Sequence, residues 1–295
     1  MKAEPWRPSM GTALIAGVGA VDAFLLVSTS YSIAPYGWSL LLACCIFLSV
    51  IWLAYSRWRP EPTLAGLART ALRFALGTCA IGVFSYLLAG LASRPLFDAQ
   101  FAACDQAMGL DWVAYRHFLF VTPALKRVTT GCYALLGAEL ILLILTLDVI
   151  KRPERAHELF LGFMLTALIV ILIGAVFPAA GAFVHYASPE MYSEPYVAQY
   201  LGLRNGSIHV IDLTRMEGIV QFPSFHAALA LVCSFVARGT RLFWPLLLVN
   251  LLVMLATPPA GGHHFIDVFA GLAVAAAVTL ALRKFACAQR RASIQ

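Results

Sequence analysis

Residues 157–177 read HELFLGFMLTALIVILIGAVF, an apolar run without a charged side chain after Glu158. A helix of about 20 apolar residues spans the hydrocarbon core of a bilayer, where lipid offers no partner for unpaired backbone groups. Seven further apolar runs flank this one, two of them rather short, at residues 11–29, 37–55, 71–92, 129–149, 223–237, 242–257 and 265–282. The sequence therefore predicts an all-α, polytopic membrane helical bundle of about eight transmembrane helices.

The composition of the 295-residue chain excludes most other classes of protein. Hydrophobic residues make up 61% and charged residues 12%, whereas a soluble domain carries about 25% charged residues. Disorder requires low hydrophobicity, so it is excluded as well. The seven cysteines are scattered and form no Cys-x-x-Cys pair, which argues against a disulfide scaffold or a zinc site. The net charge of +6 comes from basic residues that lie between the apolar segments and form no nucleic-acid-binding patch.

The basic residues indicate which loops face the cytoplasm. Segments 56–70 and 151–155 are strongly basic, whereas residues 31–37 carry no charge. Because Lys and Arg concentrate in cytoplasmic loops, we expect both termini to be cytoplasmic. Lys2 and Arg7 precede the first apolar run as in a signal peptide, but the run is longer than an apolar signal segment, so we interpret it as a retained helix.

Two connections on the opposite side are long enough to hold structure. Residues 93–128 contain apolar positions at helical spacing, and Asp98, Asp105 and Asp111 lie away from much of that stripe. This pattern predicts an amphipathic helix at the membrane interface. Residues 178–222 form the most polar stretch. We expect them to fold over a functional site, as long ordered loops often do.

Three acidic residues fall within or next to the apolar runs. Ionisable groups inside a membrane are costly and are functional candidates by default. We interpret Asp148, next to Lys151, as a solvated helix end, and expect Asp22 and Glu139 to face each other or another polar group inside the bundle. A transporter is the non-enzymatic alternative, and its signature would be charges deep in several broken helices.

A stronger signal is a group of three ionisable residues at two helix starts. His226 opens the sixth apolar run, and His263 and Asp267 open the eighth. The sixth helix leaves the outer face and the seventh returns to it, so both starts lie at the same membrane level. Topology therefore predicts that these three side chains meet at the outer ends of the helices.

The residue types in this group suit attack on phosphorus. His263 and Asp267 are four residues apart and share a helical face, so the carboxylate can fix the imidazole tautomer and raise the basicity of the other nitrogen. His226 begins a helix whose free N–H groups favour an anion, and Ser224 can cap that helix or bind a phosphate oxygen. Two glycines, Gly261 and Gly262, would let the backbone approach a bound group.

Two alternatives for this region were considered. His264 lies three residues before Asp267 and could replace His263, although its face is turned by about 100°. His263, His264, Asp267 and His226 could together ligate zinc, but adjacent histidines of one helix rarely reach a single metal. We therefore expect no metal and no other cofactor.

These residues resemble the motifs of the type-2 phosphatidic acid phosphatase superfamily. Its Pro-Ser-Gly-His motif is matched by PSFH at residues 223–226, with Phe225 in place of Gly. Its Ser-Arg-(five)-His-(three)-Asp motif keeps His263 and Asp267, whereas residues 256–257 are Ala-Thr. Its Lys-(six)-Arg-Pro motif survives only as Arg-Pro at 94–95. These departures are similar to the branch that contains inositol phosphorylceramide synthase.

The resemblance implies an organisation and a role for each matching residue. It covers about residues 70–285, a six-helix core, which leaves two extra helices in residues 1–69 and a cytoplasmic tail in residues 286–295. His263 would be the nucleophile or base, Asp267 its orienter, His226 the acid for the leaving group, and Ser224, with His264 as a further candidate, a ligand of the phosphate. Because the motif arginine is missing, we expect Arg215 first, or else Arg204 or His209, to counter the phosphate charge.

The resemblance also implies an integral-membrane phosphatase or phosphotransferase acting on a lipid phosphate. Its partners would be membrane lipids, with water or a lipid alcohol as acceptor and no nucleic acid. We expect a multi-pass protein of a bacterial inner membrane with the site on the periplasmic side. A phosphatase passes phosphate to water, whereas a transferase passes a phospho-headgroup to another lipid. The missing Arg and Lys tilt the expectation towards a diester substrate, which carries less charge than a monoester.

Overall fold

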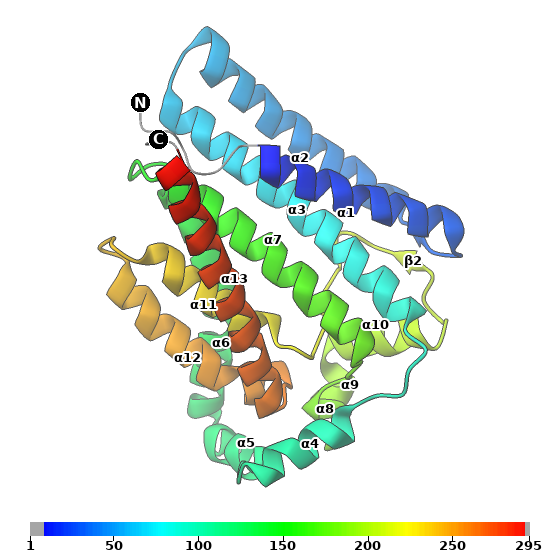
Figure 1. The fold of residues 1–295 in the computed structure, drawn as a ribbon. Helices are drawn as coiled ribbons and strands as arrows, with labels where there is room; N and C mark the ends of the chain where they lie inside the picture. Colours follow the sequence, from blue (N-terminus) through cyan, green and yellow to red (C-terminus); the bar gives the residue numbers. More distant parts are fainter. Residues whose placement is uncertain (1–8, 293–295) are drawn as a thin grey trace.

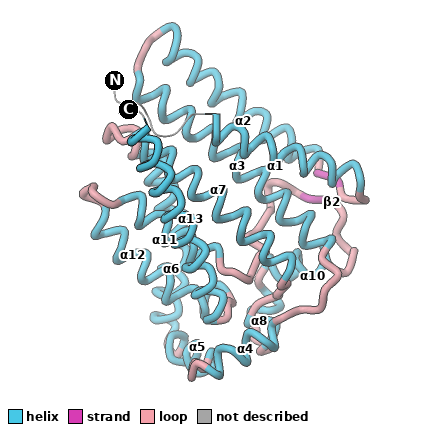
Figure 2. Tube along the Cα trace, viewed as in Figure 1, coloured by secondary structure: helices cyan, strands magenta, loops and turns pink. Residues whose placement is uncertain are grey.

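The computed structural model describes residues 9–292, and this part of the chain is almost entirely helical (Figures 1 and 2). Seven of its helices are long and apolar enough to cross a bilayer. They are α1 (Ser9–Ser28), α2 (Pro35–Leu53), α3 (Pro62–Leu91), α6 (Pro123–Thr146), α7 (Pro153–Val176), α12 (Phe243–Gly261) and α13 (Phe265–Ala292). The prediction of an all-α polytopic bundle is therefore confirmed.

Proline marks the start of four of these long helices. Pro35, Pro62, Pro123 and Pro153 each occupy the first turn, where a missing N–H leaves no bond unmade and the fixed φ suits a helix. At α6 the hydroxyl of Thr122 accepts a hydrogen bond from a first-turn N–H as well. A turn of π-helix (Ala54–Trp58) extends α2.

The predicted sixth span, residues 223–237, is shorter than a membrane span requires. It forms α11 (Phe225–Ala237), which has 13 residues, against about 20 for a bilayer crossing. Much of this helix is buried, because it is enclosed by α6, α7, α12 and α13. A helix surrounded by other helices satisfies its ends with protein groups and has no need to match the thickness of the lipid.

The two N-terminal helices cover one side of the bundle (Figure 1). The α1 helix packs on α3 and α7, and α2 packs on α3. Met10 and Leu14 of α1 pack against the apolar cluster of Leu161, Val278 and Leu282, and the first helix begins at the end of the bundle where the last helix finishes. The α3 helix starts at Pro62, before the expected domain boundary at residue 70, and α13 continues to Ala292, into the segment expected to be a tail.

The opposite end of the bundle carries the short elements (Figures 1 and 2). These are α4 (Asp98–Ala107), α5 (Trp112–Phe120), α8 (Ala182–His185), α9 (Glu190–Ser193) and α10 (Pro195–Arg204), with the parallel pair β1 (Ser32–Ile33) and β2 (Val210–Ile211). Residues 178–222 thus form an ordered cap. A salt bridge of 2.5 Å between Arg116 of α5 and Glu190 of α9 joins this cap to the segment of α4 and α5.

The expected single interfacial helix in residues 93–128 is two helices, and its acidic side faces inward. Asp98 and Asp105 are buried in α4 together with Phe101 and Ala102, whereas Asp111 caps α5 by accepting a hydrogen bond from the N–H of Ala114. The prediction that all three aspartates lie on a polar face apart from the apolar stripe does not hold for the first two, which are buried together with Phe101. They are buried because backbone N–H groups of distant segments bind them.

Glu139 and Asp148 are each bonded to a polar side chain of another helix. Asn250 of α12 donates hydrogen bonds to Glu139 of α6 at 2.8 Å and to Ser234 of α11 at 2.9 Å. Glu139 therefore faces an amide and not Asp22. Asp148 is 6% exposed and accepts a hydrogen bond of 2.8 Å from Thr70. Its interpretation as a solvated helix end is wrong, because α3 packs over it.

Candidate active site

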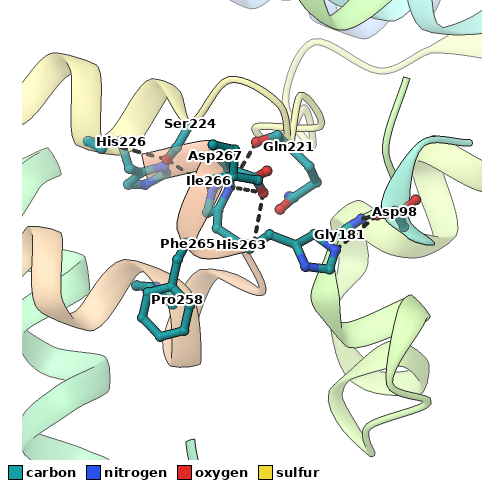
Figure 3. Close-up of polar contacts among 12 residues, drawn as sticks. Asp98, Gly181, Gln221, Ser224, His226, Pro258, His263, Phe265, Ile266 and Asp267 are labelled. Carbon is teal, nitrogen blue, oxygen red and sulfur yellow. Dashed lines mark hydrogen bonds and ion pairs between the residues drawn. The ribbon is translucent and has the colours of Figure 1, made fainter. Parts of the chain in front are cut away.

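The starts of α11 and α13 are bonded directly to each other. The N–H of Ser224, the residue before α11, donates to the carbonyl oxygen of Asp267 in α13 at 2.9 Å. A Cβ on Gly271 would lie 2.2 Å from the carbonyl oxygen of Ser224. Only glycine at this position allows the two backbones to approach so closely. The contact places the His226 segment beside the His263 segment, as the topology predicts (Figure 3).

His263 is held by two acceptors on one ring nitrogen. Its Nδ1 lies 2.9 Å from the carbonyl oxygen of Gln221 and 3.5 Å from Oδ2 of Asp267. Because both neighbours can only accept, the proton belongs on Nδ1, and Nε2 keeps a free lone pair. The Oδ2 atom of Asp267 also accepts the backbone N–H of His264 at 2.8 Å. This arrangement is the one that the spacing of His263 and Asp267 predicts.

The free Nε2 of His263 points to Ser224. The hydroxyl of Ser224 lies 3.3 Å from Nε2 and 3.4 Å from the N–H of Ala227, to which it serves as helix cap. Ser224 and Asp267 are completely buried, and His263 is 2% exposed. A hydroxyl that accepts from the helix can still donate its own proton, either to Nε2 or to an oxygen of a bound group.

His226 faces the same space from α11. The centroids of its ring and the ring of His263 are 6.5 Å apart. The ring of Tyr133, from α6, stacks on His226 at 4.3 Å, and its hydroxyl lies 3.1 Å from Nδ1 of His226. Nε2 of His226 is therefore the nitrogen left for a ligand. Two histidines with different partners, one carboxylate-bound and one phenol-bound, share the site.

The two predicted arginines do not contact these histidines in the described structure. The side chain of Arg215 is 83% exposed and pairs with Asp212 at 3.7 Å. Arg204 donates to the carbonyl oxygen of Arg94 and lies over the ring of Tyr200. Their assignment to the phosphate remains a prediction, and it requires movement of at least one side chain towards the site.

His264, the residue before α13, contacts α4. It is completely buried and lies between Asp98 and Asp105 of α4, with nitrogen-to-oxygen distances of 3.5 and 3.7 Å. Burial disfavours the charged ring, but the two carboxylates outweigh this effect and raise the pKa of His264 to about 9. His264 thus contacts protein groups on both ring nitrogens. A direct role in phosphate binding remains a prediction.

The two glycines before His263 make room for aromatic side chains of the protein. A Cβ on Gly261 would lie 2.8 Å from the Tyr133 ring, and one on Gly262 would lie 2.5 Å from Phe183 and 2.6 Å from the hydroxyl of Tyr196. Gly262 has a φ of +69°, which glycine adopts without strain. The aromatic side chains thus occupy the space in which a bound group was expected.

Four site residues carried no recognised signal in the sequence. Gln221 supplies the carbonyl oxygen at His263, Tyr133 binds His226, and Asp98 and Asp105 surround His264. A backbone carbonyl is independent of side-chain type, so no motif can show it. Tyr133 stands inside an apolar run, where an aromatic residue normally signifies packing. The seven-residue spacing of the two aspartates places them on one helical face, which is the one usable clue.

Comparison with known proteins gives one family match. Residues 99–281 match the family model of the PAP2 superfamily, a range that includes α4 from its second residue and both histidine motifs. Comparison with curated proteins and with solved structures gives no match. The superfamily consists in general of phosphatases and phosphotransferases that act on lipid phosphates. Since the matched range exceeds half of the 295 residues, the chain belongs to the PAP2 superfamily and is a multi-pass membrane enzyme of this chemical class.

Proposed function

We propose that the protein transfers a phosphoryl group or a phosphorylated headgroup from a membrane lipid. His263, Asp267 and His226 would carry out this transfer without a metal. The observation that carries this proposal is the 6.5 Å separation of the His226 and His263 rings, which lie on two helix starts and hold different partners. A phosphorus atom between them could be attacked from one ring while the other protonates the departing oxygen.

The first step forms a phosphohistidine. Nε2 of His263 attacks phosphorus with its lone pair, a P–N bond forms and the P–O bond to the lipid breaks. The lipid oxygen takes a proton from Nε2 of doubly protonated His226, whose Nδ1–H is then donated to the Tyr133 oxygen. Asp267 and the Gln221 carbonyl stabilise the positive charge that develops on His263.

The second step returns the enzyme to its first state. Water or a lipid hydroxyl gives its proton to His226 and attacks phosphorus, the P–N bond breaks and His263 regains its lone pair. Ser224 and the first N–H groups of α11 are the donors nearest to the phosphate oxygens in this arrangement. The chemistry thus needs only groups that the chain itself supplies.

A diester substrate and a lipid acceptor suit this site better than a monoester and water. The hydrogen bonds and ion pairs of Ser224, His226, His263 and Asp267 in the described structure involve no lysine or arginine. A diester carries less negative charge than a monoester and needs fewer cationic partners. This argument supports a headgroup transferase similar to inositol phosphorylceramide synthase, with a hydrolase as the alternative.

The proposal places the site on the periplasmic face of a bacterial inner membrane. The start of α13 lies at the end of the bundle that carries the short helices α4, α5 and α8, away from the start of α1 (Figure 1). The basic loops belong to the other end, which the distribution of Lys and Arg assigns to the cytoplasm. The donor and acceptor lipids would therefore come from the outer leaflet.

A panel of labelled lipids tests the reaction. Purified protein in nanodiscs is incubated with phosphatidate, a prenyl diphosphate, or phosphatidylinositol with and without ceramide. A new phosphorylated lipid identifies a transferase, whereas release of inorganic phosphate identifies a hydrolase. The matched control is His263→Ala. Absence of turnover by the wild type on all substrates, or undiminished turnover by the variant, would overturn the proposal.

A further inference from the structure

His264 lies at the centre of a buried ionic cluster. None of the three residues of this cluster is one of the motif residues that match the superfamily. Its two ring nitrogens approach Asp98 and Asp105 of α4 at 3.5 and 3.7 Å, and all three residues are buried. No hydrogen bond joins the rings of His264 and His263 in the described structure, although the residues are adjacent. The cluster therefore belongs to the support of the site and not to its reacting atoms.

Each carboxylate of the cluster also holds the backbone of a segment that builds the site. The oxygens of Asp105 accept the N–H groups of Phe265 and Ile266, both at 2.8 Å. Those of Asp98 accept the N–H groups of Gly181 at 2.7 Å and Ala180 at 3.0 Å (Figure 3). The first pair fixes the start of α13, which carries Asp267.

The second pair fixes the segment before α8, which lies against the loop before His263. The N–H of Ala182 donates to the carbonyl oxygen of Gly262 at 2.6 Å. A Cβ on Gly181 would lie 2.6 Å from that same oxygen. Asp98 therefore supports the loop before His263 through residues 180–182, and Asp105 supports it through the start of α13.

The charges around His264 require a cation. Asp98 and Asp105 face its ring from α4, and Asp267 of α13 accepts its backbone N–H. The rings of His185, at the end of α8, and of Tyr186, the next residue, lie 5.6 and 6.1 Å from its ring. Three buried carboxylates without a counter-charge would be costly. Burial and the charge of His264 lower the pKa of His185, so that His264 is the histidine of this group that carries the proton.

We propose that Asp98, His264 and Asp105, named here the α4 clamp, are positioning residues that fix His263 and Asp267 and balance the charge around them. This inference rests on the proposed function of His263 and Asp267. The clamp holds the backbone on both sides of His263, while its protonated ring offsets the carboxylates next to Asp267. A cation near the reacting groups disfavours their protonation, and an anion favours it.

Two clamp variants should therefore shift the pH dependence of the reaction in opposite directions. In His264→Gln the cation is lost, so the acidic limb of the kcat/KM profile should shift to higher pH by about 1 unit. In Asp105→Asn an anion is lost, so the limb should shift to lower pH by a similar amount. Both variants should lower kcat at least tenfold with little change in KM, because the substrate contacts are retained.

Asp111→Asn is the matched control. Asp111 is an acidic residue of the same segment, but it caps α5 and contacts no clamp residue. It should leave both kcat and the acidic limb unchanged. If the two clamp variants lose activity without opposite shifts of the limb, the role of the cluster is structural only and the inference is overturned. Asp98→Asn replaces Asp105→Asn if the latter does not fold.

A measurement without substrate separates this inference from the proposed function. The seven histidines are labelled with ¹⁵N, and the spectrum of the wild-type protein in nanodiscs is recorded at pH 8. Ordinary histidines are neutral at this pH, whereas the clamp requires a ring with both nitrogens protonated whose signal is absent from His264→Gln, which distinguishes it from a charged His226. Such a ring in a protein that turns over no lipid would leave the clamp intact and reject the reaction. Seven neutral rings would reject the clamp.

Discussion

The hydroxyl of Tyr133 lies 3.1 Å from Nδ1 of His226, and the two rings are stacked with their centroids 4.3 Å apart. A phenol can accept the Nδ1 proton when the imidazole is charged and donate its own proton when the imidazole is neutral. His226 therefore keeps a partner in both protonation states. Such a partner is what a residue needs if it gives a proton in one step and takes one in the next.

Tyr133→Phe should lower kcat about fivefold with little effect on KM. The ring stacking is preserved, and the loss is one hydrogen bond, worth about 1 kcal/mol, or about a factor of five in rate. Steady-state kinetics on the lipid substrate found in the panel would measure it. A variant with unchanged kcat would show that His226 does not depend on the phenol.

His263→Ala should abolish turnover, whereas the effect of His226→Ala should depend on the leaving group. The nucleophile is required for any substrate, but an acid is needed only when the departing oxygen is strongly basic. The comparison uses a lipid phosphoester and an aryl phosphoester of the same lipid chain. The His226 variant should lose at least a hundredfold on the former and much less on the latter. Equal losses on both esters would contradict the acid role.

Gly271→Ala should destabilise the protein by about 1–3 kcal/mol, as overpacking in a tight interior does. The new methyl group would lie 2.2 Å from the backbone carbonyl oxygen of Ser224, and backbone cannot rotate aside. The melting temperature in detergent should fall by several degrees, and activity should fall with it. Gly137→Ala is the control, because a Cβ there meets nothing within 4 Å. Equal melting temperatures for the two variants would contradict the close contact of α11 and α13.

EDTA should leave the rate unchanged over an extended preincubation. The proposed steps place the attacking lone pair on His263 and the proton on His226, so that no metal takes part. The measurement is turnover before and after chelation, with zinc added back at the end. A rate lost on chelation and restored by zinc would favour the alternative in which the histidines and Asp267 ligate a metal.

The sequence predicts the long helices and the approach of Asp267 to His263 because both depend on local spacing. Seven apolar runs are long helices, and the i, i+4 spacing of His263 and Asp267 fixes their shared face. The short α11 helix shows the limit of hydropathy, which cannot tell a helix surrounded by lipid from one surrounded by protein. Residues 223–237 have the composition of a span but occupy the interior.

The role of Asp98 and Asp105 in supporting the site cannot be predicted from the sequence, because their partners are distant in the chain. Asp98 binds N–H groups more than 80 residues away, and Asp105 binds groups about 160 residues away. From the sequence alone, their carboxylates are expected on the water-facing side of an interfacial helix. Only the fold shows that backbone donors of two other segments satisfy them, so that the polar face of α4 is its buried face.

The same cluster predicts how stability depends on alkaline pH. Burial opposes the charge on His264, but Asp105 and Asp98 raise its pKa from 6.5 to about 9. A raised pKa means that the folded state binds the proton more tightly than the unfolded state, so the stabilisation is complete below pH 6.5 and disappears as the pH rises towards 9. The melting temperature of the wild type should therefore fall between these values. His264→Gln should melt at a lower temperature throughout and show a flatter slope across this window. A wild-type melting temperature that is constant from pH 6.5 to 9 would contradict a charged His264.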